Sequence, residues 1–444
     1  MGIIILNFII LVEVTFACYC LATKSYQFKT LGLLKIGIFA ALTMLALTSI
    51  IELDLRWLLL GMVLLIRAIV GGITLAVYSK KDASRNFKPF RVVFRALVRL
   101  AIISIALSPM LLTPGQNPIL PTGNYPVLTR EVTYRDASRV ETFGSGGGNR
   151  EVNVTFYYPE TDTGKFPLVV FSHGAFGVRS SNTSTMKDLA SHGYVTCAVD
   201  HPYHALFTKD DKGKITMIDP GFYKEFMDTT KGVYDEKTTI GIQHRWLKLR
   251  TDDLNFVLDT IKNSALAGGA DEFYRLIDTD KIGLIGHSLG GAADVQLARD
   301  RDDIDAVVNL DGDMLGEYLD NADGQYVLNK KAFTTPLLNL YTDDLKRGFD
   351  RVMKDGKDYP QKWVAASDPY DFDVFLNGTN HLSLTDLPIV MPSMVAVISW
   401  QMQGKIGDQN ADPVAVIKTM NRLVLGFYDR FLKGAGDFKP EETY

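Results

Sequence analysis

The sequence predicts a mostly parallel α/β sheet with helices on both faces, preceded by about four transmembrane α-helices. Three observations predict this arrangement. Nearly all long apolar stretches lie before residue 114, and the remaining sequence alternates short apolar strands with helical periods. One of these strands ends in Gly-His-Ser-Leu-Gly, and a helical pattern follows it. The length of 444 residues fits two or three domains at roughly 150 residues each.

Composition narrows the functional classes. A net charge of −4 gives no indication of nucleic-acid binding, so we expect no nucleic-acid partner. Three cysteines cannot build a disulfide scaffold. The motifs that do stand out need neither a cofactor nor a metal, and we expect neither.

Four apolar stretches open the chain. Each approaches the roughly 20 residues that a helix needs to cross a bilayer. The first is not a cleaved signal peptide, because it lacks a basic amino-terminal region and further apolar stretches follow. The stretches cover residues 3–22, 31–51, 57–78 and 92–112. We therefore predict a transmembrane helical anchor over residues 1–113, a linker over 114–128, and an α/β domain over 129–444.

The charges of the loops predict the orientation of this anchor. The first and third loops are basic, and basic loops favour the cytoplasmic side. Their basic residues are Lys24, Lys29, Lys80, Lys81, Arg85, Lys88 and Arg91. A multi-pass integral membrane protein with its α/β domain on the extracytoplasmic side is expected.

The fourth apolar stretch is the least regular of the four. Arg91, Arg95 and Arg99 recur on one face of it, which leaves a clean apolar run only over residues 100–112. If this segment lies along the membrane surface, the α/β domain becomes cytoplasmic. Spanning is the preferred interpretation, because arginines near a helix end can reach to the headgroups.

Two charged residues interrupt the middle of apolar stretches. Glu13 and Arg67 fall at similar depth in the predicted topology. Charges within lipid tend to pair with one another. The hypothesis is that the two side chains face each other inside the helix bundle; the alternative is that each reaches separately to headgroups.

The α/β region begins with two strands joined by a glycine-rich turn. After the fourth strand, residues 203–237 form a polar, aromatic-containing insertion that is longer than a simple crossover needs. This segment is expected to be a lid or the wall of a substrate pocket; the alternative is a surface excursion that packs back on the domain. The expected strands cover residues 130–134, 152–158, 168–171, 194–199, 281–287, 305–310, 336–341 and 373–376, and the expected helices include 186–191 and 239–261. The last helix is expected to start at Asp412-Pro413, a side-chain cap followed by proline, and to stop at Gly434.

The strand at 281–287 leads into Ser288, the predicted nucleophile. A serine at the apex of a strand–turn–helix has a strained backbone, so the residues two before and two after it must lack bulk. Gly286 and Gly290 occupy those positions.

A serine hydroxyl needs a neighbouring base to accept its proton. In this motif the nucleophile, acid and histidine follow in that chain order. Of seven histidines only His381 follows Ser288, just after the last strand. Asp311 and Asp343 each lie at the carboxyl end of a strand, and the pattern alone does not choose between them as the acid.

The oxyanion of an acyl-transfer intermediate needs backbone donors. The amide of Leu289 directly follows the nucleophile, and the amide of Ala175 lies in the loop after an earlier strand. His173 and His287 flank these positions and are expected to be structural.

Several sequence pieces in combination resemble the platelet-activating-factor acetylhydrolase family, in its plasma and type II intracellular branch. These pieces are Phe171-Ser172-His173-Gly174, residues 188–194 with 198–201, Ile285-Gly286-His287-Ser288-Leu289-Gly290-Gly291, and Asn309-Leu310-Asp311-Gly312. The resemblance covers residues 150 to 400 approximately, and neither the membrane segments nor the 203–237 insertion.

The resemblance implies an α/β-hydrolase fold, Asp311 as the acid and Ala175 as the second oxyanion donor. It also implies calcium-independent hydrolysis of short or oxidised acyl esters of phospholipids. The expected function is thus a membrane-anchored serine esterase or lipase whose partners are the bilayer and an ester or phospholipid substrate. The alternatives are an acyltransferase or peptidase, or a catalytically silent receptor domain on the same scaffold.

Overall fold

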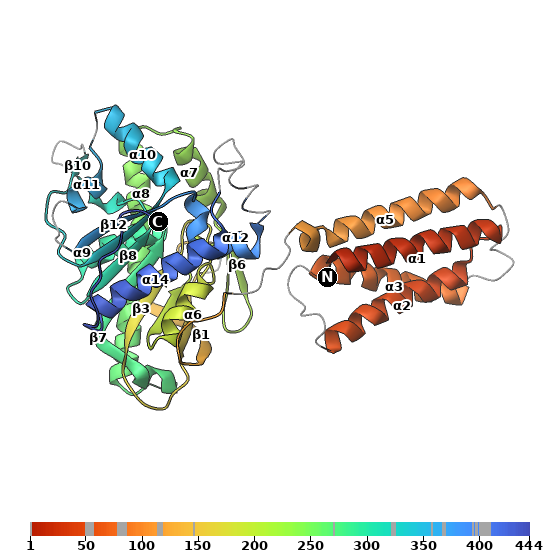
Figure 1. Ribbon diagram of the computed structural model, residues 1–444, viewed down its shortest axis with the longest axis horizontal. Coiled ribbons are helices and arrows are strands. Elements are labelled where there is room, and N and C mark those ends of the chain that lie inside the picture. The colour runs from red at the N-terminus through yellow and green to blue at the C-terminus, as the bar shows by residue number, and fades with distance from the viewer. Residues whose placement is uncertain are drawn as a thin grey trace. The chain divides into compact units, whose positions relative to one another are not determined.

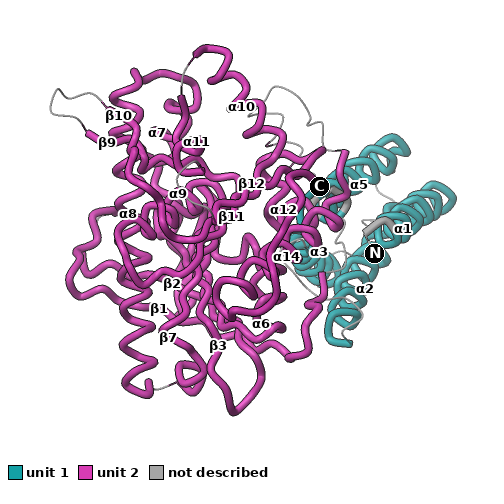
Figure 2. Tube along the Cα trace, turned by 60° about the vertical axis from the view of Figure 1, so that its left-hand side comes forward, with its two compact units in different colours: residues 1–116, 390–394 teal, residues 117–389, 395–444 magenta. Residues whose placement is uncertain are grey.

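The computed structural model describes residues 2–48, 57–77, 87–112, 119–144, 147–269, 271–320, 326–356, 358–365, 370–392, 395, 398 and 410–444. The chain divides into two compact units, which are treated separately below (Figure 2). The helical unit contains residues 1–116 and 390–394, and the α/β unit contains 117–389 and 395–444.

The helical unit contains four long helices that lie side by side (Figure 1). They are α1 (Gly2–Ala22), α2 (Phe28–Leu47), α3 (Leu58–Val77) and α5 (Pro89–Leu112). Three segments, Ile4–Ala22, Phe28–Leu47 and Leu59–Val77, are long and apolar enough to cross a membrane. The membrane crossing of α5 and the orientation stay predictions, and Lys80, Lys81 and Arg85 of the third loop lie outside the described residues.

Helices α2 and α3 approach closely at two glycines. A Cβ atom on Gly71 would lie 2.7 Å from the carbonyl oxygen of Gly32. Small residues permit such backbone contact between helices in a membrane.

The ion pair expected inside the bundle is present. Arg67 Nη2 donates to Glu13 Oε1 at 2.6 Å. Arg99 from α5 also donates to this carboxylate, with its Nε 2.7 Å from Glu13 Oε2. The sequence predicts that Arg99 reaches to the headgroups; in the structure its guanidinium pairs with Glu13 instead.

The α/β unit is built on an eight-stranded sheet in the order β1-β2-β4-β3-β7-β8-β11-β12. The strands β1 and β2 pair antiparallel, β2 pairs antiparallel with β4, and the other pairs are parallel. The strands are β1 (Val127–Val140), β2 (Asn149–Pro159), β3 (Phe166–Ser172), β4 (Val195–Val199), β7 (Ile277–His287), β8 (Ala306–Leu310), β11 (Leu337–Thr342) and β12 (Asp371–Leu376). The predicted fold class is confirmed.

Helices cover both faces of this sheet (Figure 1). Helices α8 (Glu236–Leu266) and α9 (Leu289–Asp300) pack on one face, and α6 (Thr183–Ser191) and α14 (Pro413–Phe431) on the other. Alternate residues of one strand serve the two cores: Leu168 of β3 lies in the first and Val169 in the second. Helix α14 begins as expected, with the side chain of Asp412 accepting from the Ala415 amide and proline in the first turn.

The insertion over residues 203–237 folds as a small hairpin and a helix. The hairpin pairs β5 (Phe207–Lys209) with β6 (Ile215–Met217), and α7 (Pro220–Thr230) follows. Phe222 of α7 is buried in the core, as the packing-back alternative expected. The end of α7 reaches the candidate site described below, as the pocket-wall interpretation expected.

Several short elements were not predicted. They are the hairpin of β9 (Tyr318–Asp320) and β10 (Tyr326–Leu328), and the helices α10 (Asp343–Lys354), α11 (Pro360–Ala365) and α12 (Leu387–Val390). Residues 119–126, within the predicted linker, are attached to α6: the backbone amide of Thr122 donates to Asp188 Oδ1 at 2.7 Å.

Candidate active site

Ser288 lies on a strained bend between β7 and α9. Its φ of 55° and ψ of −123° lie in a region that non-glycine residues rarely adopt. A Cβ on Gly290 would overlap the Ser172 carbonyl, and a Cβ on Gly286 would overlap the first turn of α9. Both positions therefore require glycine, and the bend places the serine side chain at the carboxyl edge of the sheet.

His381 meets Ser288 from the loop after β12. Its Nε2 lies 2.8 Å from Ser288 Oγ, and its Nδ1 lies 2.7 Å from Asp311 Oδ2. Because the carboxylate can only accept, Nδ1–H donates to it, which leaves the Nε2 lone pair to accept the serine proton. The structure thus brings together the three side chains that the sequence singled out, here called the Ser288 relay.

Asp311, which directly follows β8, is held by the donors of Thr342. The backbone amide of Thr342 donates to Oδ1 at 2.7 Å, and the Thr342 hydroxyl lies 2.9 Å from each carboxylate oxygen. Among the residues that the structure describes, its ion-pair partner is His381 alone. Sequence reasoning missed Thr342, although its place at the end of the neighbouring strand β11 was available as a signal.

The two partners shift each other's pKa. Burial alone would raise the pKa of Asp311, but the hydrogen bond and charge of His381 and the Thr342 donors outweigh it, so this pKa is lowered. Burial would lower the pKa of His381, but the hydrogen bond and charge of Asp311 outweigh it and raise that pKa.

The alternative acid, Asp343, does not reach the imidazole ring. Its carboxylate accepts the backbone N–H of Gly378 at 2.9 Å. Its neighbour Asp344 accepts the backbone N–H of His381 at 3.2 Å. Both carboxylates hold the backbone of the loop that carries the histidine, whereas the ring Nδ1 pairs with Asp311.

The loop predicted to supply an oxyanion donor lies against the serine. A Cβ on Gly174 would come within 3.1 Å of Ser288 Cβ and 2.8 Å of His287 Nδ1, so the backbone approaches the site only as glycine. The Arg250 guanidinium, which is fully buried, donates to the carbonyls of both His173 and Gly174, the second at 3.2 Å. These bonds hold the backbone of the two residues that precede Ala175, the predicted second oxyanion donor.

The flanking histidines have structural contacts, as expected. His287 Nε2 donates to the His381 carbonyl at 2.8 Å. His173 Nδ1 donates to the Gly174 carbonyl at 2.7 Å, and its Nε2 accepts the His201 amide at 3.1 Å.

A second set of the same three residue types lies beneath this loop, fully buried. His201 Nε2 lies 3.0 Å from Ser172 Oγ, and His201 Nδ1 lies 3.1 Å from Asp253 Oδ2. Arg150 holds Asp253 with two hydrogen bonds of 2.8 and 3.1 Å. We call this set the Ser172 relay. Sequence reasoning missed it, although Asp253 falls among the apolar positions of α8, where a charge indicates a buried partner.

A cavity of about 510 Å³ opens onto the Ser288 relay. Phe226, Thr229 and Thr230 of α7 and Trp246 of α8 line it together with Leu289. The insertion therefore supplies a wall of the cavity that contains Ser288 and His381. The hydroxyl of Thr229 is enclosed there and has no hydrogen-bond partner in the part of the chain that the structure describes.

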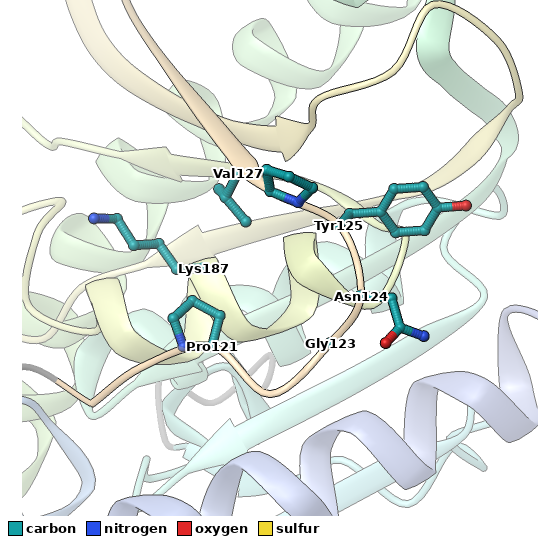
Figure 3. A pocket seen from close by; sticks show the side chains of 7 residues that line it. Pro121, Gly123, Asn124, Tyr125, Val127 and Lys187 are labelled. Carbon is teal, nitrogen blue, oxygen red and sulfur yellow. The ribbon is translucent and has the colours of Figure 1, made fainter.

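A second hollow of about 430 Å³ lies between residues 121–127 and α6 (Figure 3). Tyr125 and Lys187 are part of its lining, and their side chains extend in different directions from it (Figure 3). None of its lining residues belongs to either relay, so the larger cavity is the candidate active site.

Comparison with known proteins identifies the family. A family model described as platelet-activating factor acetylhydrolase, isoform II, matches residues 137–442. The chain belongs to this family. The resemblance seen in the sequence is therefore confirmed, and the acetylhydrolase match covers the candidate site and extends through the insertion and α14.

Relatives of this acetylhydrolase-family chain are named as acetylhydrolases, a putative phospholipase A2 and cutinases. The platelet-activating factor acetylhydrolase of Canis lupus familiaris is 29% identical over 164 residues, which are 34% of this chain and 36% of the relative. A putative phospholipase A2 of Schizosaccharomyces pombe is 22% identical, over 65% and 73% of the two chains. Cutinase est1 of Thermobifida alba is 25% identical, over 40% and 44%. The match to the dog relative spans about a third of that protein's length.

A solved structure shares the fold. The ferulic acid esterase from Streptomyces cinnamoneus superposes with a TM-score of 0.53 at 23% identity, covering 74% of this chain and 97% of that one. The shared fold is the eight-stranded sheet with helices on both faces.

Proposed function

We propose that this chain is a membrane-anchored serine ester hydrolase that works through an acyl-enzyme. One observation carries the proposal: Ser288 Oγ lies 2.8 Å from His381 Nε2 within a cavity of about 510 Å³. A serine becomes nucleophilic when such a base can take its proton, and the cavity gives an ester access to it.

In the first half-reaction Ser288 Oγ attacks the ester carbonyl while its proton moves to His381 Nε2. The resulting oxyanion is stabilised by the amides of Leu289 and Ala175, each worth roughly 3 kcal/mol by analogy with donor deletions. When the intermediate collapses, the C–O bond breaks and the alcohol leaves with the proton from His381. Asp311 stabilises the imidazolium cation throughout.

In the second half-reaction water attacks the acyl-enzyme. His381 accepts a proton from this water and returns it to Ser288 Oγ as the acid is released. No metal or cofactor takes part in this scheme.

The substrate class follows from the cavity and the relatives. Apolar side chains such as Phe226 and Trp246 stand beside hydroxyls such as that of Thr229. Such a lining suits a short acyl chain, or one that carries oxygen atoms. The names of the relatives and three helices that can cross a membrane support esters of phospholipids as substrates. Anchoring would raise the effective concentration of such substrates.

The test combines a fluorophosphonate probe with graded esters. The probe should label Ser288 in the full chain, and p-nitrophenyl acetate and butyrate should be hydrolysed faster than the palmitate ester. The assignment is contradicted if the protein is folded and the probe does not label it, or if the probe labels a residue other than Ser288. Protease protection of the α/β unit in sealed vesicles tests the predicted extracytoplasmic side.

A further inference from the structure

The helical unit carries a surplus of positive charge at the middle of its helices. Glu13 is the one acidic residue in the sequences of α1, α2, α3 and α5. The basic residues Lys35, Arg67 and Arg99 lie in the interiors of the other three helices.

These four charged residues lie at similar depth. The hydrogen bond of 3.0 Å from the Lys88 amide to the Tyr26 hydroxyl shows that the α1–α2 and α3–α5 connections lie at the same end of the unit. Each of the four residues lies 7 to 10 positions from the end of its own helix at these connections. At a rise of about 1.5 Å per residue, this places them about 10–15 Å into the helices.

One carboxylate serves two guanidinium groups. Glu13, only 3% exposed, accepts from Arg67 and Arg99. Arg67 Nη1 is enclosed and has no hydrogen-bond partner among the described residues. Lys35 faces α3, since its Cβ lies 3.2 Å from the position of a Cβ on Gly71, and the charges of Arg67, Arg99 and Glu13 all act on its ammonium group.

An uncompensated cation in hydrocarbon costs at least about 2.5–3.5 kcal/mol. A further anion at this cluster would remove that cost and would occupy the free guanidinium N–H. Carboxylates and phosphates are the anions that arginine binds best, through paired hydrogen bonds. Within the hydrocarbon layer, the anions that can be delivered are those attached to an acyl chain.

We propose that Lys35, Arg67 and Arg99 form an intramembrane binding site for the anionic group of a lipid. The group is a carboxylate or a phosphate, and a fatty-acid carboxylate fits the depth better because its protonated form crosses hydrocarbon readily. The site is independent of the hydrolase reaction proposed above.

The experiment uses the full chain in phosphatidylcholine nanodiscs and radiolabelled palmitate. Wild type should bind palmitate saturably, and Lys35→Met should weaken this binding at least tenfold. The matched control is Lys29→Met, which removes an exposed charge near the end of the same helix and should bind as wild type does. Hexadecanol, with a chain of the same length but no charge, should not compete.

Two further measurements identify the kind of anion that binds and test whether positive charge drives the binding. Competition by 1-palmitoyl lysophosphatidate assigns the site to phosphates as well, and its failure assigns the site to carboxylates. Glu13→Gln removes the one competing anion and should tighten binding; helical circular dichroism and ester turnover verify that each variant is folded. The proposal is overturned if wild type shows no saturable binding, if Lys35→Met binds as tightly as wild type, or if hexadecanol competes equally.

Discussion

The α/β unit contains the same three side chains twice, with nearly the same hydrogen-bond lengths. In the Ser288 relay the serine–histidine and histidine–aspartate distances are 2.8 and 2.7 Å, and in the Ser172 relay they are 3.0 and 3.1 Å. The first opens onto a cavity, whereas Ser172 and His201 are both 0% exposed. Residue types and distances alone therefore do not make a nucleophile.

The charge around the two aspartates also differs. Asp253 is neutralised by Arg150, and burial together with Arg250 lowers the pKa of His201 to about 4. Asp311 is held by neutral Thr342 donors, so its charge acts on His381 and raises the pKa of that ring. His381 is therefore the histidine that can carry a proton during the reaction, whereas His201 is held neutral and accepts a hydrogen bond within the core.

The largest expected effect is the difference in activity between alanine variants of the two serines. Ser288→Ala should lower kcat for p-nitrophenyl butyrate by roughly 10⁴-fold or more, because the nucleophile is lost. Ser172→Ala should keep activity within a few fold and destabilise the fold by about 1 kcal/mol, the value of one buried hydrogen bond. Initial rates and urea unfolding of the two variants measure both. Equal loss of activity in two folded variants would contradict the distinction.

Substitution of the two aspartates should likewise affect activity in one case and stability in the other. Asp311→Asn should lower kcat by roughly 10³–10⁴-fold, because the amide no longer stabilises the protonated ring. Asp253→Asn removes the charge that Arg150 Nη2 contacts, although Glu141 stays paired with Nη1 at 2.9 Å, and should destabilise the fold by about 1–3 kcal/mol. The measurements are kcat below the unfolding transition and the urea midpoint. A large kcat loss in a stable Asp253→Asn protein would make the buried relay part of the chemistry.

The sequence predicted the sheet, the bend and His381 because each follows from local pattern. A glycine-flanked serine after an apolar strand is a local signal, and His381 was the one histidine downstream of it. Asp311 and Asp343 stayed level on pattern, since both end strands; the family resemblance favoured Asp311, and in the structure its carboxylate pairs with the imidazole at 2.7 Å. The cavity wall from α7 was one of two interpretations of the insertion, and pattern alone could not choose between them, because the direction in which an insertion folds depends on long-range packing such as that of Phe222.

Arg250 holds the backbone of the loop before Ala175, and its effect is expected to be smaller. We predict that it is a positioning residue, because it donates to the carbonyls of His173 and Gly174, which directly precede Ala175. Arg250→Met should lower kcat roughly 10- to 100-fold with little change in KM, because a misaligned donor weakens only the transition state. Affinity for a trifluoromethyl ketone, which forms the oxyanion adduct, should fall in parallel. A fluorophosphonate labelling rate that falls while the ketone affinity stays constant would contradict this role.

Partial restoration by Arg250→Lys provides the matched control. Lysine keeps the charge and can donate to one carbonyl, but it cannot form the fork that reaches both. Its kcat should therefore lie between those of Arg250→Met and wild type. If both variants lose only stability, measured as the urea midpoint, the residue supports the fold and not the donor loop.

The smallest expected effects are the pH dependences of activity and of stability. Activity depends on the raised pKa of His381 in the Ser288 relay, and stability depends on the lowered pKa of His201 in the Ser172 relay. The base must be neutral to act, and Asp311 raises the pKa of His381 above its usual 6.5, so kcat/KM should fall on acidification with a midpoint above pH 6.5. Asp311→Asn should move this midpoint to lower pH, because burial then dominates. The pKa of His201 affects stability instead. It is about 4 in the folded protein and near 6.5 in the unfolded chain, so between pH 4 and 6.5 the unfolded chain binds more protons.

The contribution of His201 to stability is thus fully present above pH 6.5 and is lost as the pH falls toward 4. Activity should therefore decline first, in a protein that is still folded, and should return when the pH is restored to 8. Parallel pH series of kcat/KM and of the urea midpoint test this order. If the loss of activity coincides with unfolding, or if Asp311→Asn leaves the activity midpoint unchanged, the contrast between an available and a neutralised aspartate does not hold.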